Sequence, residues 1–434
     1  MTRRLVLLSF ACLCMGFAVY GSFVPLSLRH VSVGEAMRQF VTTPFDLHIS
    51  GTDFVSNVLL FIPIGFFLIG GLADRSRGLT ITLLLPVVGF AVVLSIAIEF
   101  GQTFVVGRTP SWDDVLAESI GCAIGSFAWL VAGPPVVGFL APLLHSESRT
   151  DRAFRLLGAY AALWILLGLL PFDFTLRPQE IAEKFREGRI VLEPFAGATV
   201  QDVIGTWLMA IPLGAFCVLA AIHFRAPRPI MVAVGTGIGL SAGIESIQVL
   251  AMSRTADVTD FTMNSLGVIT GVVIATRWLA RPRDEAAHEG MRLWPLVAVL
   301  AWFLVLIGRH WSPFDFLVDA SFARSRLPGM FRVPFYSYYW ASPLDALTEA
   351  TTKMLLGIPV GALLRLTWQP RSWSGEVAQA VAITIFAGFL FLVIELGQLL
   401  LPSRYPDQTD IYLGTFGAVL GLLAIMLLMR RDSQ

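Results

Sequence analysis

Four polar side chains recur at one fixed spacing three times along this chain. The pattern is Glu-x2-Gln-x5-Arg-x5-Asp, and an isoleucine directly precedes each glutamate. Carboxylates can take up protons or bind cations, an amide can recognise hydroxyl or amide groups, and a guanidinium can hold a phosphate by two parallel hydrogen bonds. The three copies are Glu99, Gln102, Arg108 and Asp114, then Glu245, Gln248, Arg254 and Asp260, then Glu395, Gln398, Arg404 and Asp410.

A second motif lies upstream of each copy. An acidic residue stands ten positions before the proline of an apolar Pro-x-Gly segment, and these acids are Asp53, Asp202 and Glu349. In the first copy Asn57 follows Asp53 by one helical turn, and Thr206 and Lys353 take its place in the other copies. The recurrence predicts three tandem repeats, at residues 1–144, 145–290 and 291–434.

Each aspartate of the pattern is followed by two glycines four residues apart, for example Gly121 and Gly125 after Asp114. On a helix these three residues share one face. We therefore expect this helix to approach a neighbour closely along the glycine stripe.

The composition places these motifs in a membrane, because 56% of the residues are hydrophobic and only 14% are charged. A helix needs about 20 apolar residues to cross a bilayer, and the first copy offers runs at 5–28, 54–73, 78–98 and 119–144. The fold class predicted is an all-α polytopic membrane protein with about 12 transmembrane helices. Four spans per copy make the three repeats parallel.

Arginines in the short loops set the orientation, because positively charged loops stay in the cytoplasm. They are Arg75 and Arg77, Arg225 and Arg228, and Arg365 and Arg371. We predict cytoplasmic N- and C-termini, and polar clusters at the outer face. The apolar stretch near the N-terminus is interpreted as an anchor helix.

Several function classes are not indicated. The 31 basic and 31 acidic residues balance, so no nucleic-acid partner is expected. The four cysteines form no C-x-x-C pair and have no histidine at ligand spacing, so neither a metal nor another cofactor is predicted.

The polar clusters have two interpretations. Buried carboxylates cost several kcal/mol unless paired, and the arginine of each copy is the expected partner of its glutamate, its aspartate or both. The cluster could join helix ends, which we favour for Asp114, Asp260 and Asp410. For the Glu-Gln-Arg set we favour a polar pocket, because ionisable residues in membrane segments usually mark function.

The first copy resembles the VanZ-like family, named for a teicoplanin-resistance accessory protein. The resemblance rests on Asp53-x3-Asn57-Val-Leu-Leu-Phe-Ile-Pro63-Ile-Gly65, on Glu99-x2-Gln102, and on Arg108 with Trp112-Asp113-Asp114. It extends over the chain when three degenerate copies are allowed. It implies a bacterial cytoplasmic membrane protein acting at the cell envelope and a link to glycopeptide-antibiotic resistance. An asparagine expected soon after the final aspartate survives only as Asn264, and Glu118 and Gly414 replace it.

Three functions remain open. The favoured one is a binding module for membrane lipids or a lipid-linked envelope precursor, with the arginines gripping phosphate. The second is an intramembrane lipid-modifying enzyme with Glu99, Glu245 or Glu395 as general base. The third is a transporter, which the clustering of charge at one membrane face argues against.

Overall fold

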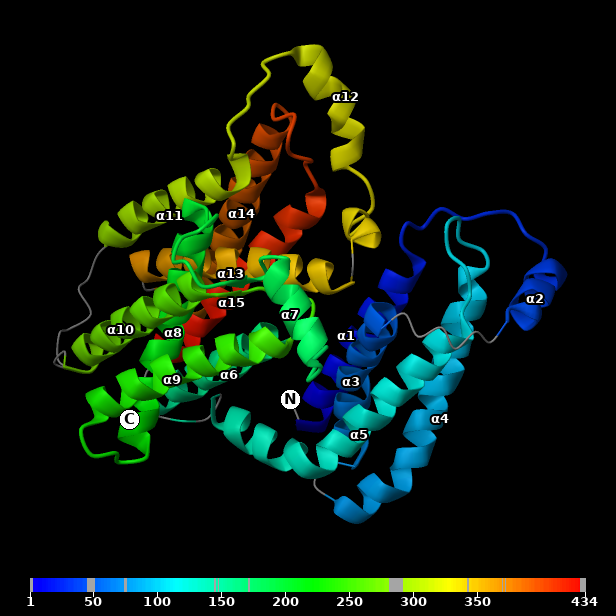
Figure 1. The fold of residues 1–434 in the computed structure, drawn as a ribbon, viewed down its shortest axis with the longest axis horizontal. Coiled ribbons are helices and arrows are strands. Elements are labelled where there is room, and N and C mark those ends of the chain that lie inside the picture. Colours follow the sequence, from blue (N-terminus) through cyan, green and yellow to red (C-terminus); the bar gives the residue numbers. More distant parts are fainter. Residues whose placement is uncertain are drawn as a thin grey trace. The chain divides into compact units, whose positions relative to one another are not determined.

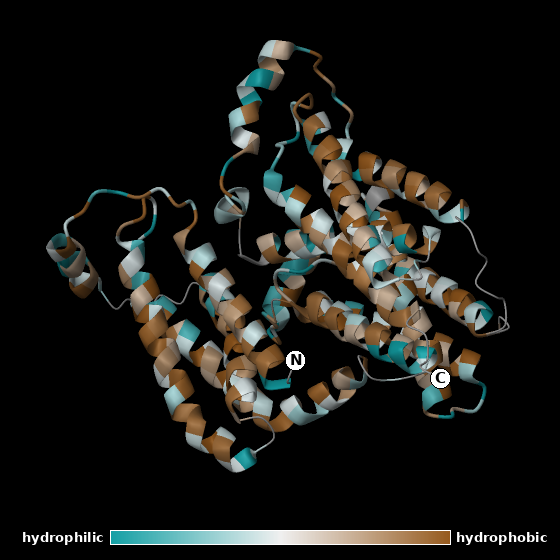
Figure 2. Cartoon of the chain, turned by 180° about the vertical axis from the view of Figure 1, so that it is seen from behind, coloured by the Kyte–Doolittle hydropathy of each residue, from teal (hydrophilic) through white to brown (hydrophobic). Residues whose placement is uncertain are grey.

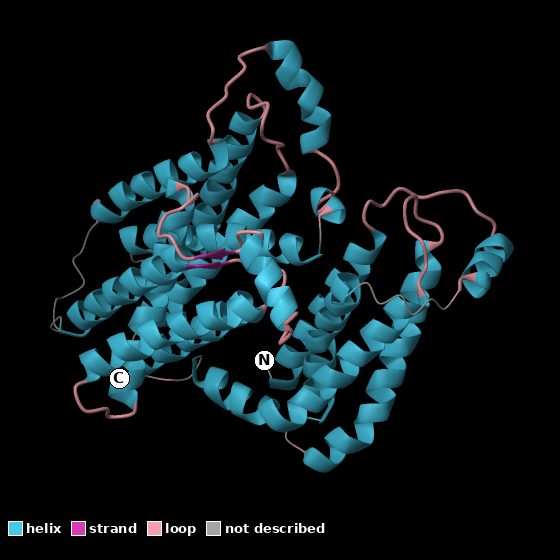
Figure 3. Cartoon of the chain, viewed as in Figure 1, coloured by secondary structure: helices cyan, strands magenta, loops and turns pink. Residues whose placement is uncertain are grey.

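The structure is a computed structural model that describes residues 3–44, 51–73, 76–143, 146, 148–170, 172–280, 292–341, 343–368, 370 and 372–429. Helices account for most of these residues, as Figure 3 shows. The chain folds into two compact units. One comprises Met1–Ala141, Leu327–Glu349 and Asp407–Thr409, and the other comprises Pro142–Arg326, Ala350–Pro406 and Asp410–Gln434.

In the described part of the first predicted repeat, there are four long α-helices, one short α-helix and a 3₁₀ helix (Figure 1). Ser32 caps the short helix and Ser111 caps the last long helix, each by accepting hydrogen bonds from the first helical turn. The elements are α1 (Arg3–Phe23), α2 (Val33–Thr42), α3 (Gly51–Ala73), α4 (Arg77–Gln102), α5 (Trp112–Leu140) and the 3₁₀ helix η1 (Ala141–Leu143).

The second repeat has the same order of long helices. Its short helix precedes a strand of two residues that pairs in parallel with a second such strand, Ile190 opposite Ala256. The elements are α6 (Arg149–Leu169), α7 (Pro178–Arg186), β1 (Ile190–Val191), α8 (Val200–His223), α9 (Pro229–Leu250), β2 (Ala256–Asp257) and α10 (Val258–Ala280).

The third repeat follows the order of the first. Its elements are α11 (Trp294–Trp311), α12 (Ala320–Met330), the 3₁₀ helix η2 (Ser337–Trp340), α13 (Pro343–Thr367), α14 (Trp373–Gln398) and α15 (Gln408–Met429). The predicted boundaries at 144/145 and 290/291, and the loop arginines Arg75 and Arg371, lie outside the described residues.

Among the described residues, eleven helices are long and apolar enough to cross a membrane, which confirms an all-α polytopic membrane protein. Figure 2 shows apolar residues along the long helices and hydrophilic ones concentrated at ends and loops. The prediction was about twelve spans. The helix that falls short is α13, because Asp345, Glu349 and Lys353 occupy its first three turns.

The second and fourth long helices of each repeat pack backbone to backbone, as the glycine stripe predicts. A Cβ atom added to Gly125 of α5 would collide with the Ile62 carbonyl of α3. Gly271 and Gly421 stand in the same relation to the carbonyls of Ile211 and Ile358. This close approach fixes the distance between the helix that carries the aspartate of the pattern and the helix that carries the upstream acid.

The segments after the first and third long helices are joined in every repeat. The backbone N–H of Arg29 donates to the Phe104 carbonyl at 2.9 Å. The equivalent bonds in the other repeats run from Thr175 to Leu250 at 2.8 Å and from Leu317 to Leu400 at 2.7 Å. This join holds the loop that carries the arginine of the pattern against the end of the first helix.

Candidate functional site

The glutamate and glutamine of the pattern lie on one face of the third long helix, at its C-terminal end. In repeat 1, Glu99 is 1% exposed and its Oε1 accepts a hydrogen bond from Gln102 Nε2 at 2.9 Å. Its Oε2 accepts one from the backbone N–H of Ser111 at 2.7 Å. Glu99 therefore ties the end of α4 to the residue that caps α5.

Repeat 3 keeps this arrangement more closely than repeat 2 does. Glu395 Oε1 accepts from Gln398 Nε2 at 2.9 Å, and both side chains are buried. Glu245 is only partly buried and accepts from the backbone N–H of Asp257 at 3.3 Å. Gln248 turns to another partner and donates to the Gly168 carbonyl at 2.7 Å.

The aspartate of the pattern contacts the second long helix in all three repeats. Its partner stands at the position of Asn57, one helical turn after the upstream acid, so the two motifs meet in space although more than 50 residues separate them. The pairs are Asn57 Nδ2 to Asp114 Oδ1 at 2.8 Å, Thr206 Oγ1 to Asp260 Oδ1 at 3.0 Å, and Lys353 Nζ to Asp410 Oδ1 at 2.6 Å.

The arginine does not make the pair that the sequence predicts. Arg108 Nε donates to the Val24 carbonyl at 3.0 Å and its Nη2 donates to the Gly21 carbonyl at 2.8 Å, in place of bonds to Glu99 or Asp114. The last carbonyls of a helix lack partners within the helix and carry its negative dipole end. The guanidinium therefore caps α1.

The other two arginines cap the equivalent helices. In each of them, Nε donates to the carbonyl just past the end of the first long helix. The hydrogen bond that joins the two loop segments brings this carbonyl within reach of the arginine. The bonds are Arg254 Nε to Leu170 O at 2.6 Å, Arg254 Nη2 to Leu167 O at 2.6 Å, and Arg404 Nε to Ser312 O at 2.8 Å.

An aromatic residue from the third repeat covers Arg108. The guanidinium lies 4.4 Å from the ring centroid of Tyr339, whose hydroxyl donates to the Gly107 carbonyl at 2.5 Å. Burial lowers the pKa of Arg108, and the charges of Glu99 and Asp114 oppose that change. An arginine stays protonated under such conditions, so this part of the site keeps one fixed positive charge.

The upstream acids have different surroundings. Asp202 closes a capping box at the start of α8, where its Oδ2 accepts from Thr199 Oγ1 at 2.7 Å. Glu349 is exposed on α13. Asp53 lines a cavity in repeat 1 together with the rest of that polar set. Sequence position alone does not distinguish these three environments.

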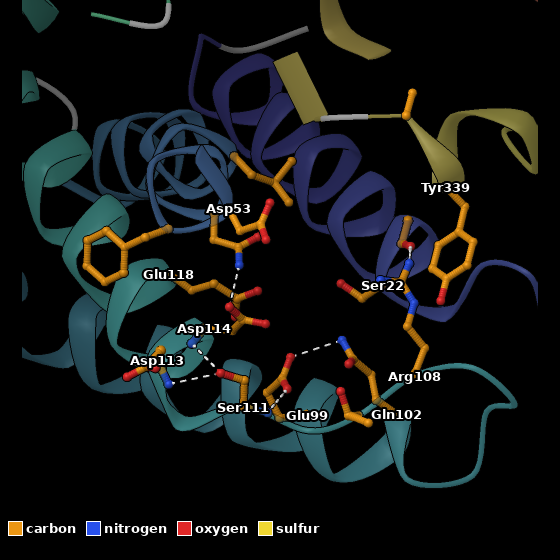
Figure 4. Close-up of a pocket in the computed structure, with 16 residues that line it drawn as sticks. Ser22, Asp53, Glu99, Gln102, Arg108, Ser111, Asp113, Asp114, Glu118 and Tyr339 are labelled. Carbon is orange, nitrogen blue, oxygen red and sulfur yellow. Dashed lines mark hydrogen bonds between the residues drawn. The ribbon is translucent and has the colours of Figure 1, made fainter. Parts of the chain in front are cut away.

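The repeat-1 cavity has a volume of about 530 Å³ and opens among α1, α3, α4 and α5 (Figure 4). All six repeat-1 residues predicted as site residues line it. The full lining is Gly21, Ser22, Asp53, Phe54, Asn57, Leu60, Glu99, Gln102, Arg108, Thr109, Ser111, Asp113, Asp114, Glu118, Tyr339 and Ala341.

Glu118 is a cavity residue that the prediction missed. Its side chain is 2% exposed, and its Oε2 has no hydrogen-bond partner among the described residues. It stands where repeat 2 has Asn264, so in the sequence it is a departure from the pattern. The sequence feature that could have identified Glu118 is its charge within a predicted membrane helix.

Repeat 3 assembles a group that could ligate a metal, which the sequence did not predict. One donor atom each from His310, Glu395 and Asp410 lies within 4.8 Å of the others. His310 lies on α11, far from Glu395 and Asp410 in the sequence. No metal-ligand spacing in the sequence therefore indicates this group. The ammonium of Lys353 already binds Asp410, and a second cation beside it would be repelled.

The model of one protein family, described as VanZ/LLP1, matches three tandem segments, residues 7–133, 157–280 and 295–429. The chain belongs to the VanZ/LLP1 family. Each match lies within one of the predicted repeats, so the glutamate, glutamine, arginine and aspartate of every copy fall within a VanZ/LLP1 segment. No curated protein and no solved structure matches the chain significantly.

Proposed function

We propose that this VanZ/LLP1 protein binds the polar headgroup of a membrane lipid or lipid-linked envelope precursor in the repeat-1 cavity. The observation that carries the proposal is the cavity itself, whose volume of about 530 Å³ suits a small-molecule ligand. The proposal places the protein in the bacterial cytoplasmic membrane.

The position of the cavity along the helices favours an amphiphilic ligand. It lies where α4 ends and α5 begins, while the remainder of both helices is apolar. Large apolar side chains such as Leu85, Val93 and Phe127 are exposed on these helices. A lipid could therefore place its headgroup among the polar residues and keep its chains in the bilayer.

The loops at the opposite ends of the helices supply the orientation. Arg77 is the first residue of α4, and Arg225 and Arg228 lie in the short connection between α8 and α9. Arginines at short loops favour a cytoplasmic position for those loops. On that basis the repeat-1 cavity faces the outer side and both termini face the cytoplasm. A lipid-linked precursor exposed at the outer face would connect the protein to glycopeptide-antibiotic resistance.

Filling the cavity tests the proposal. Ser22 lines the cavity and donates to the carbonyl four residues before it. Ser246 makes the same local bond on an exposed face of α9 and supplies a matched control. The full-length protein and the Ser22→Trp and Ser246→Trp variants are extracted with their surrounding membrane, and the retained lipids are identified by mass spectrometry.

We expect one lipid class to be enriched with the wild-type protein and with Ser246→Trp, and to be lost with Ser22→Trp. Identical lipid profiles for all three proteins would overturn the proposal. If the enriched lipid is instead converted to a new product during incubation, the lipid-modifying enzyme becomes the better interpretation.

A further inference from the structure

The repeat-1 cavity is lined by more acidic than basic side chains. Five carboxylate side chains line it, Asp53, Glu99, Asp113, Asp114 and Glu118, and Arg108 is the basic residue among the lining groups. Nε and Nη2 of that arginine are already bonded to backbone carbonyls. A cavity of this composition favours a cationic group over an anionic one.

Glu118 supplies an independent indication. Buried carboxylates are nearly always paired, because an unpaired one carries the full cost of lost hydration. Its Oε2 is buried without a hydrogen-bond partner among the described residues, and the side chain lines the cavity. The polar neighbour of its carboxyl group is the Ser95 side chain on α4. Figure 4 shows Glu118 beside Asp114 among the residues that line the cavity.

Repeat 3 shows which chemical group fits at this position. There the Asn57 equivalent is Lys353, whose Nζ binds Asp410 Oδ1 at 2.6 Å. The residue at the Asn57 position pairs with the aspartate in every repeat, so Asn57 in repeat 1 and Lys353 in repeat 3 occupy corresponding places. Repeat 3 therefore carries its own primary ammonium where repeat 1 has a neutral amide.

We propose that the repeat-1 cavity binds a primary ammonium group, held by Asp114 and Glu118 beside the Asn57 amide, which stands where repeat 3 has the ammonium of Lys353. This inference rests on the proposed headgroup binding and names the headgroup chemistry. It replaces the sequence-based expectation that the arginines grip phosphate, since the guanidinium of Arg108 caps a helix instead.

The binding experiment compares headgroups. The full-length protein in detergent is titrated with lipids of identical chains that carry ethanolamine, choline or glycerol headgroups. The ethanolamine lipid should bind at least about tenfold more tightly than the choline lipid, the ratio expected for one hydrogen bond to a charged group, because trimethylammonium has no N–H donor. Equal binding of the three lipids would overturn the ammonium assignment.

Soluble competitors identify the source of the group. If free ethanolamine displaces the lipid only at a far higher concentration than the ethanolamine lipid needs, the site is assigned to an aminolipid. If free ethanolamine and the ethanolamine lipid are equally potent, the site is assigned to a soluble amine. Both results support an ammonium. Displacement by Mg²⁺ at concentrations where ethanolamine has no effect would show a metal site and contradict the proposal.

Two substitutions localise the site. Asn57→Lys introduces the repeat-3 residue, and its internal ammonium should abolish binding of the ethanolamine lipid while the protein stays folded. Thr206→Lys is the same change at the repeat-2 position and should leave binding unchanged. Undiminished binding to the Asn57→Lys variant would rule out the site.

Glu118→Gln separates binding from structure. The neutral amide should weaken binding of the ethanolamine lipid at least about tenfold without lowering the unfolding temperature, since a buried carboxylate oxygen without a partner costs stability. A purely structural Glu118 would lower the unfolding temperature and leave lipid preference unchanged. Should Ser22→Trp abolish binding while headgroup preference is absent, headgroup binding stands and only the ammonium assignment fails.

Discussion

Repeats 1 and 3 share one scaffold but neutralise their aspartate in different ways. Asp410 in repeat 3 is 7% exposed and has a lysine ammonium as its partner, whereas Asp114 in repeat 1 has a neutral amide from Asn57. In repeat 3 the aspartate is therefore neutralised by a side chain of the same repeat. In repeat 1 five acidic side chains and one arginine line a cavity, and this difference is the basis for proposing a binding site there.

The largest expected effect comes from removing the internal cation of repeat 3. Lys353→Met leaves Asp410 buried beside no ammonium and should destabilise the protein by about 3–5 kcal/mol. Asn57→Leu removes one hydrogen bond to a half-buried aspartate and should cost about 2 kcal/mol. Thermal unfolding in detergent, followed by tryptophan fluorescence, measures both.

A double variant controls this comparison. Adding Asp410→Asn to Lys353→Met removes both charges together and should recover most of the lost stability. If Asn57→Leu proves as costly as Lys353→Met, the two repeats neutralise their aspartates alike and the comparison fails.

The shared scaffold should respond equally in both repeats. Gly125→Leu and Gly421→Leu each force a side chain against a backbone carbonyl of the partner helix, so each should cost about 3 kcal/mol. Gly138→Leu places the same side chain on α5 where no atom lies near the added Cβ. The yield of monodisperse protein and the unfolding temperature report the effect. Equal losses at Gly138 would show that leucine itself, rather than the close approach, is responsible.

The arginine caps should differ with the number of bonds that each makes. Arg108→Lys loses two bonds to the end of the first helix and should cost about 1.5–2 kcal/mol, whereas Arg404→Lys loses one and should cost about 1 kcal/mol. Lipid retention is measured on the same samples. A variant of Arg108 that keeps full stability yet loses lipid would instead support the phosphate-gripping arginine.

The smallest effect concerns Tyr339, which covers Arg108. Tyr339→Phe keeps the ring over the guanidinium and removes the hydroxyl that donates to the Gly107 carbonyl. The unfolding free energy should fall by about 1 kcal/mol. Tyr339→Leu removes the ring as well and should cost more. Equal losses for the two variants would indicate that the ring makes no separate contribution.

Much of this molecule follows from local pattern. The repeat, the all-helical membrane fold and the glycine contact between second and fourth helices are all determined by short-range spacing, because a helix places residues three and four apart on one face. The same spacing placed Glu99 beside Gln102. The family match over three segments agrees with the repeat.

The tertiary structure alone decided which groups become partners. Arg108 lies nine residues after Glu99, yet its bonds go to the carbonyls at the end of α1, because the joined loop segments bring that helix end closer. The burial of Glu118 Oε2, without a partner in the described part of the chain, and the contact of Lys353 with Asp410 both depend on helices far apart in sequence. Spacing within a helix predicts a shared face, but the charge balance of a site is set by the neighbours that packing brings to it.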